Sequence, residues 1–321
     1  MTLDLGSNSV ASRGGCYTFC VRQLMVNADD FGLTAGVNRA IVETHRGGIV
    51  SSATLMASGA AFDDAVAQAR AAPTLSVGCH VVLVDGAPVS EPGAVDTLLA
   101  TRSAAPEQFH SRLSSVATRA MFGGFDPDQL VEEIAAQIGK LQSAGLQVTH
   151  LDTHKHTHIF PEILRALLRA ARICGVRAIR NPFVPAAAFS AAQFRGKPDL
   201  WKRYGQVRML RAFAGQFREK TRRAGLATPD GIVGVVETGA LDASLLRQAL
   251  THLPEGTWEL VCHPGYDDAG LRAARTRLTQ ARDQERRLLM SDELRTFLEE
   301  QDIGLMSYRE LAGSPAESVF P

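Results

Sequence analysis

Short apolar runs alternate with segments of helical periodicity along most of this 321-residue chain. Such alternation predicts strands joined by helical crossovers, and therefore a parallel sheet. The apolar runs predict strands at residues 23–26, 52–56, 75–80, 147–151, 176–179, 231–236, 258–261 and 303–306. The fold expected from this pattern is α/β, a single-domain variant (β/α) barrel with about seven to eight parallel strands.

The segments between the strands carry helix signals. Thr34 is the expected N-cap of the first helix, and Asp126 with Pro127 forms a cap followed by proline in the first turn. Helices are predicted at residues 37–45, 63–72, 126–141, 161–173, 199–223, 242–252 and 276–301. Residues 83–125 have a weaker pattern and are expected to form a long excursion over one face.

Unusual polar residues stand at the predicted strand ends. Asp29 and Asp30 end the first strand, and His80 ends the third. Asp152 and His154 follow the fourth strand, and His263 follows the strand at residues 258–261. In a parallel barrel the carboxyl ends of the strands share one face, where catalytic groups gather. The pattern therefore predicts a site at this face.

Four of the nine histidines lie in residues 150–158. Alternate residues of a strand share a face, but the proline at 161 predicts that the chain turns soon into a helix. We expect one or two of these histidines to be metal ligands. His156 and His158 are expected to line the pocket or to orient ligands, as is Asp152. A surface metal trap is the competing interpretation.

Imidazole and carboxylate together are the ligands of zinc and similar divalent ions. A hydrolytic site leaves one coordination position open, and the ion lowers the pKa of a water molecule bound there. A nearby carboxylate then accepts a proton, and a separate acid protonates the leaving group. The residues offer His80, His154 and one aspartate of the pair as ligands, the other aspartate as base, and His263 as acid.

Each of these residues also has a structural interpretation. An aspartate pair before a helix is commonly an N-cap with a solvated neighbour, although Thr34 is the better cap here. A lone histidine on an apolar strand is commonly a core residue with satisfied hydrogen bonds. Arg180, after the predicted strand at 176–179, is placed to contact substrate or to sit as an exposed basic residue.

Composition limits the classes of partner. Lys+Arg and Asp+Glu number 34 each, so the formal net charge is zero, which removes the electrostatic argument for a nucleic-acid partner. The basic stretch 202–223 is expected to be a solvated helix face. No apolar run is long enough for a membrane span. A homodimer is compatible with the sequence.

Residues 1–20 are rich in serine and glycine and are expected to be a disordered or mis-assigned extension. The expected domain covers residues 21–315, with a tail at 316–321. The five cysteines lack CxxC spacing, and those in the domain lie in apolar contexts, which indicates buried thiols. A cytoplasmic location is expected.

Four segments together resemble the YdjC-like carbohydrate deacetylases, a family that includes chito-oligosaccharide deacetylases and a hopanoid-biosynthesis-associated group. They are VNADDFG at 26–32, GCHVVL at 78–83, THLDTHKHTH at 149–158 and ELVCHPG at 259–265. The resemblance runs in order from about residue 22 to about residue 311.

The resemblance implies a variant (β/α) barrel that removes N-acetyl groups from amino sugars. It implies Asp30, His80 and His154 as ligands of one divalent ion, Zn²⁺ or Mg²⁺, and Asp29 as the base. His263 is implied as the general acid by analogy with related polysaccharide deacetylases. Two imidazoles with one carboxylate suit zinc better than magnesium.

Two other classes stay open. A barrel metallophosphoesterase or amidohydrolase also uses His-x-His, but usually on the first strand, whereas here the first strand carries the aspartate pair. A non-enzymatic metal or sugar binder has no need of Asp29 and His263 beside a full ligand set. The identity of the N-acetyl sugar depends on the loops at 84–125 and 182–216, which the sequence does not resolve.

Overall fold

The computed structural model describes residues 22–100, 107–185, 198–274 and 276–313. The extension expected at residues 1–20 and the tail expected at 316–321 lie outside the described residues, so these boundaries stay predictions.

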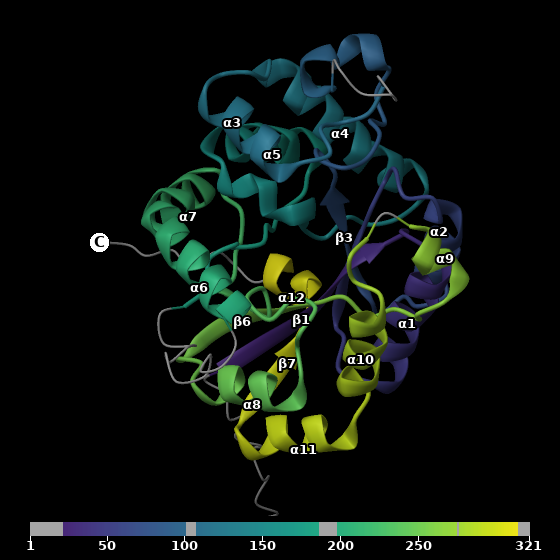
Figure 1. Cartoon of the computed structure of the whole chain (residues 1–321), viewed down its shortest axis with the longest axis vertical. Helices are drawn as coiled ribbons and strands as arrows, with labels where there is room; N and C mark the ends of the chain where they lie inside the picture. Colours follow the sequence, from purple (N-terminus) through teal and green to yellow (C-terminus); the bar gives the residue numbers. More distant parts are fainter. Residues whose placement is uncertain (1–21, 101–106, 186–197, 275, 314–321) are drawn as a thin grey trace, which may run out of the picture.

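The described residues form an α/β fold around one parallel sheet of seven strands (Figure 1). The order is β4-β3-β2-β1-β6-β5, and β7 also pairs with β1. The strands are β1 (Arg22–Phe31), β2 (Ser52–Leu55), β3 (Ser76–Val81), β4 (Leu151–Thr153), β5 (Gly231–Val233), β6 (Gly256–Cys262) and β7 (Ile303–Met306). Because β1 pairs with β2, β6 and β7, it is the centre of the sheet.

The α/β class and the parallel strands are confirmed, but a closed barrel is not found in the described residues. The sheet has the form of a half-barrel that ends at β4 and β5. Residues 176–179, predicted as a strand, make only isolated bridges, Leu151 with Ile179 and Ala178 with Ala227. A regular ladder does not form here: the proline that follows has no N–H to donate, and Asn181 Nδ2 donates to the carbonyls of residues 229 and 230.

Helices surround this sheet (Figure 1). They are α1 (Ala35–Gly47), α2 (Phe62–Arg70), α3 (Leu113–Met121), α4 (Pro127–Ser143), α5 (Pro161–Cys174), α6 (Pro198–Leu210), α7 (Ala214–Arg223), α8 (Ala243–Thr251), α9 (Ala269–Ala273), α10 (Gln280–Leu289), α11 (Asp292–Glu300) and α12 (Tyr308–Gly313). The described residues also form short 3₁₀ segments: η1 (Pro92–Ala94), η2 (Asp96–Leu98), η3 (His154–Ile159) and η6 (Arg211–Phe213).

The predicted caps are confirmed, and some helix boundaries are corrected. The side chains of Thr34 and Asp126 accept hydrogen bonds from the first turns of α1 and α4. The single helix predicted at 276–301 is two helices, because Ser291 stops α10 and caps α11 through its Oγ. Helix α3 lies inside the predicted excursion, and its buried face of Val116 and Ala120 is too short to predict a helix from the sequence.

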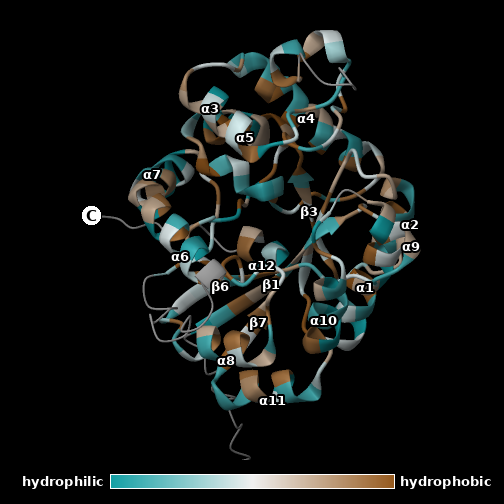
Figure 2. Cartoon of the chain, in the orientation of Figure 1, coloured by the Kyte–Doolittle hydropathy of each residue, from teal (hydrophilic) through white to brown (hydrophobic). Residues whose placement is uncertain are grey.

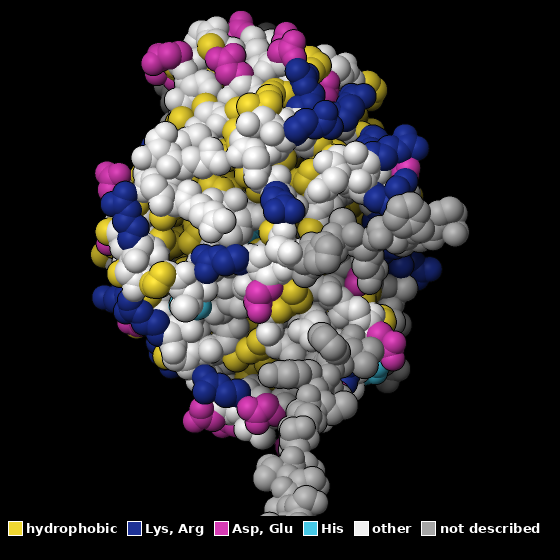
Figure 3. Space-filling model, turned by 180° about the vertical axis from the view of Figure 1, so that it is seen from behind, with side chains coloured by type: hydrophobic (Ala, Val, Ile, Leu, Met, Phe, Trp, Pro, Cys, Tyr) yellow, Lys and Arg dark blue, Asp and Glu magenta, His cyan; other side chains and the backbone are white. Residues whose placement is uncertain are grey.

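The core lies between the sheet and the inner faces of the helices (Figure 2). Helix α5 shows the pattern, with buried Ile163, Leu164 and Leu167 on one side. The face shown in Figure 3 carries basic and acidic side chains among small apolar areas, as expected for a chain of zero net charge. Within the described ranges, no helix is both long and apolar enough to span a membrane.

Candidate active site

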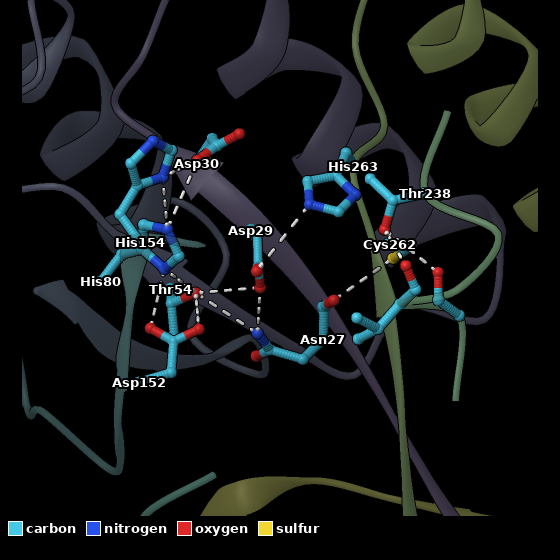
Figure 4. A network of polar contacts seen from close by, with 12 residues as sticks. Asn27, Asp29, Asp30, Thr54, His80, Asp152, His154, Thr238, Cys262 and His263 are labelled. Atoms are coloured by element: carbon cyan, nitrogen blue, oxygen red, sulfur yellow. Dashed lines mark hydrogen bonds and ion pairs between the residues drawn. The ribbon is translucent and has the colours of Figure 1, made fainter. Parts of the chain in front are cut away.

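The two aspartates of the pair reach the same site because β1 is irregular where they stand. Neighbouring residues of a regular strand point to opposite faces of the sheet. In β1 the register against β2 shifts between Ala28 and Phe31, and Asp30 has a left-handed backbone with φ of 65°. Such a bulge re-aims side chains. Both carboxylates therefore lie beside His80 (Figure 4).

Asp30, His80 and His154 bring three ligand atoms together (Figure 4). Asp30 Oδ1 lies 3.4 Å from His80 Nε2 and 3.3 Å from His154 Nδ1. The two ring nitrogens are 3.2 Å apart. Atoms bound at about 2.0–2.1 Å in a tetrahedron stand about 3.3–3.4 Å from each other. Spacing and donor types therefore fit a tetrahedral cation site.

His80 is oriented by Asp152 on the neighbouring strand. Register places His80 opposite Asp152, and His80 Nδ1 lies 2.8 Å from Asp152 Oδ1. Burial alone would lower the pKa of His80, but the negative charge of Asp152 and hydrogen bonds to Asp152 and Asp30 raise it to about 10. The surroundings of His80 Nε2 thus favour positive charge there, whether a proton or a metal ion.

Asp29 is held by the buried side chain of Arg180. Arg180 Nη2 donates to Asp29 Oδ1 at 2.6 Å, and Nη1 donates to Oδ2 at 2.9 Å. Asn27 Nδ2 and Thr54 Oγ1 also donate to Oδ1, at 3.0 and 3.3 Å. Burial would raise the pKa of Asp29, but the charge and hydrogen bonds of Arg180 hold it well below its usual range.

Arg180 has no exposed surface and lies behind Asp29, so it is neither the substrate contact nor the exposed basic residue that the sequence predicts. It contacts two further carboxylates, Asp152 at 2.5 Å and Glu259 at 2.6 Å. Tyr308, from the short helix α12, donates its hydroxyl hydrogen to Glu259 at 2.6 Å. This buried network holds the Asp29 side chain in place from the interior side of the site.

A second group of possible ligands consists of Asp29, His80 and Asp152. Both carboxylates of this group already bind Arg180, and that of Asp152 also contacts His80 Nδ1. A cation there would have to displace a buried guanidinium. The group containing Asp30 and His154 is therefore the better cation site.

His263 follows β6 and lies between two carboxylates. Its Nε2 is 3.9 Å from Asp29 Oδ2 (Figure 4), and its Nδ1 is 3.9 Å from Glu285 Oε2. Its backbone N–H donates to the same Glu285 oxygen at 2.6 Å. The side chain of His263 is 12% exposed and that of His154 is 21% exposed, whereas Asp29 and Asp30 are almost fully covered. The two histidines thus form the solvent side of the site.

The remaining predicted histidines lie on the turn after β4. Lys155 and His156 have left-handed backbone angles, with φ of 55° and 53°, which is uncommon outside glycine and concentrates at functional sites. Burial lowers the pKa of His156 to about 3 and holds that of His158 well below its usual range, so both rings are neutral. Buried His156 Nδ1 and His158 Nε2 have no hydrogen-bond partner in the described part of the protein.

The structure adds residues to the site that the sequence analysis did not identify. Arg282 contacts Asp30 from α10 at 2.5 Å, and Glu285 on the same helix contacts His263. Glu259 and Tyr308 support Arg180. A glutamate inside an apolar strand was a recognisable signal for Glu259. The charges of α10 resemble any solvated helix, and no signal singled out Arg282 or Glu285.

Known proteins match the part of the chain that forms most of the site. The model of the family described as YdjC-like protein matches residues 23–300, which includes every residue of the site except Tyr308. The chain belongs to the YdjC-like family. Among relatives of this YdjC-like protein, a carbohydrate deacetylase of Brevibacillus brevis is 32% identical over 289 residues, covering 90% of this chain and 99% of the relative. A chitooligosaccharide deacetylase of Salmonella paratyphi C is 32% identical over 253 residues, covering 78% and 84%.

A solved structure shares the fold of this YdjC-like protein. It is an Enterococcus faecalis protein named for cellobiose-phosphate cleavage, with a TM-score of 0.71 and 25% identity, covering 90% of this chain and 98% of the other.

Proposed function

We propose that this YdjC-like protein is a metal-dependent hydrolase that removes N-acetyl groups from an amino sugar, an oligosaccharide or a glycoconjugate. The main support for the proposal is that three possible ligands of one cation lie close to a separate carboxylate and a separate histidine. The names of two relatives, a carbohydrate deacetylase and a chitooligosaccharide deacetylase, support the substrate class.

Asp30, His80 and His154 would hold the cation. Their near-equilateral spacing supports a tetrahedral ion such as Zn²⁺ more than octahedral Mg²⁺, whose neighbouring ligands at about 2.0–2.1 Å stand only about 2.9 Å apart. When bound, the ion polarises the acetyl carbonyl and assists attack by water.

Asp29 would act as the base. Its Oδ1 is occupied by Arg180, Asn27 and Thr54, whereas its Oδ2 accepts a hydrogen bond from Arg180 and faces His263. Because its pKa is held low, Asp29 stays ionised and ready to accept a proton from the attacking water at neutral pH.

His263 would act as the acid. Its Nε2 lies across the site from the ligand atoms and points toward Asp29, while Glu285 holds its backbone and faces Nδ1. A protonated Nε2 can deliver its proton to the departing amine nitrogen. Neutral His156 would line the pocket, on the turn after β4.

A screen of acetate release tests the proposal. The substrates are N-acetylated chito-oligosaccharides, another N-acetylglucosamine conjugate and a glycolipid head group, each with zinc, magnesium or chelator. We expect acetate from at least one compound, and only when metal is present. No acetate from any N-acetyl sugar, together with hydrolysis of a phosphate ester in a parallel assay, would favour the metallophosphoesterase class.

A further inference from the structure

We propose that Arg282 is a positioning residue that leaves Asp30 only one oxygen to offer a cation. By doing so it selects an ion that accepts few ligands, such as Zn²⁺, over an ion that requires many oxygens, such as Ca²⁺. The inference rests on the metal site proposed above.

The two oxygens of Asp30 face different partners. Oδ1 lies 3.4 Å from His80 Nε2 and 3.3 Å from His154 Nδ1, and so faces the proposed ion. Oδ2 lies 2.5 Å from Arg282 Nη2, a close charge-assisted hydrogen bond. The carboxylate is therefore shared between a guanidinium on one side and the ligand histidines on the other.

The contact is built into the fold. Arg282 is only 1% exposed, and its Nε donates to the carbonyl of Leu278 at 3.1 Å. Its Nη1 is buried with no hydrogen-bond partner in the described part of the molecule, an arrangement that proteins rarely keep without a use. Arg282 thus keeps its contact with Asp30 although this leaves one of its N–H groups without a hydrogen bond.

Gly265 makes room for the contact. A Cβ on Gly265 would lie 3.0 Å from Arg282 Cδ and 3.2 Å from Arg282 Cβ. The Gly265 N–H also donates to the Arg282 carbonyl at 3.2 Å. Gly265, two residues after His263, therefore allows Arg282 on α10 to pack against the loop that carries the proposed acid.

Ligand number gives the expected selectivity. Ca²⁺ takes six to eight oxygen ligands and often binds both oxygens of a carboxylate, whereas a zinc site needs three protein ligands and accepts imidazole. With Oδ2 engaged by Arg282, Asp30 can bind through Oδ1 alone. Loss of the guanidinium would release Oδ2 for a second bond to Ca²⁺.

The ratio of two affinities isolates this effect. Zn²⁺ and Ca²⁺ carry the same charge, so removal of the positive charge of Arg282 changes both affinities in the same direction and largely cancels in their ratio. The affinity gained from the freed oxygen does not cancel in the ratio, because only Ca²⁺, which requires many oxygen ligands, gains from it.

The experiment titrates metal-stripped full-length protein with Zn²⁺ and Ca²⁺ by calorimetry, with chelator competition for the tighter ion. The variants are R282M and R282Q, and the matched control is R286M on the same helix, where Arg286 pairs with Asp283 instead of Asp30. We expect the Zn²⁺-to-Ca²⁺ affinity ratio to fall about 10–100-fold in the Arg282 variants, a typical effect of removing a ligand's partner, and to stay unchanged in R286M.

Circular dichroism checks the fold of each variant. If the Arg282 variants do not fold, G265A gives a second test, because its added methyl group crowds Arg282 by a few tenths of an ångström while leaving the charge in the chain, and the ratio should then fall by a smaller factor. An unchanged ratio in folded variants, with wild-type protein that binds Zn²⁺, overturns the role of Arg282 alone. A wild-type protein that binds neither ion overturns the proposed metal site and this inference with it.

Discussion

Replacement of Arg180 by methionine tests how the buried charge network supports both the fold and the base. Arg180 is fully buried and contacts three carboxylates, those of Asp29, Asp152 and Glu259. The variant keeps an unbranched but shorter side chain and leaves these carboxylates without their shared counter-charge.

The expected loss of stability is large. Breaking one buried ion pair by removing one partner costs about 3–5 kcal/mol, because the other charge is left buried and unpaired. Three carboxylates share Arg180, so this figure is the lower end of the expectation. The free energy of unfolding of a typical domain is only about 5–15 kcal/mol. The variant should therefore unfold at a much lower denaturant concentration than the wild type.

The same change should move the pH dependence of activity. Burial favours the protonated form of Asp29, and Arg180 is the main group that opposes it. Without Arg180 the pKa of Asp29 rises, and the base is protonated over more of the working range. The acid limb of kcat/KM should therefore shift to higher pH, and activity should recover in part as pH rises.

Denaturant titration and a pH–rate profile measure the two effects, with R169M as control, since Arg169 pairs with Asp128 on the exposed surface. The control should behave as wild type. Wild-type stability together with an unmoved acid limb in R180M would refute the argument that this network supports Asp29.

The other predictions address the ligands, the catalytic pair and one buried acid. His80→Ala and His154→Ala should each lose the bound ion by metal analysis; full occupancy in both would remove them from the ligand set. Asp29→Asn should keep the ion and lose about 10²–10⁴-fold in kcat, and His263→Ala should keep it and slow amine departure; loss of metal in Asp29→Asn with retention in Asp30→Asn would reverse the two aspartate roles. Burial raises the pKa of Glu237 to about 7, so the folded state holds a proton that the unfolded chain releases, and wild-type stability should fall as pH rises from about 4.5 to 7. Glu237→Gln should remove this fall in denaturation measured at several pH values, and an equal slope in both proteins would show that Glu237 is not its cause.

The sequence predicted the fold where local signals agree with packing. Strand β7 and the caps at Thr34 and Asp126 were found because apolar runs and capping residues are short-range features. The sequence did not predict that residues 176–179 form only isolated bridges, because closure of a barrel depends on the partner at a distance. The fourth strand begins at Leu151, a few residues later than the sequence predicts, since the residues before Leu151 belong to a loop.

The site was predicted in its composition but not in its geometry. A polar residue at a strand end is visible in sequence, and this identified His80, Asp152 and His263. The bulge at Asp30 is not visible, because its left-handed backbone is a product of packing. The sequence does not single out Arg282 for a related reason: whether a charged residue on a helix is buried depends on how that helix packs against the rest of the fold.

Acetate release by wild-type protein and Asp29→Asn, at matched metal content, tests the central claim most directly. Both proteins are stripped, reloaded with Zn²⁺, assayed for bound metal and given the same N-acetylated amino-sugar oligomer. The account predicts acetate from the wild type, none after chelation, and a rate at least about 10²-fold lower from the loaded variant. Equal rates from the two loaded proteins, or release that persists in chelator, would contradict it.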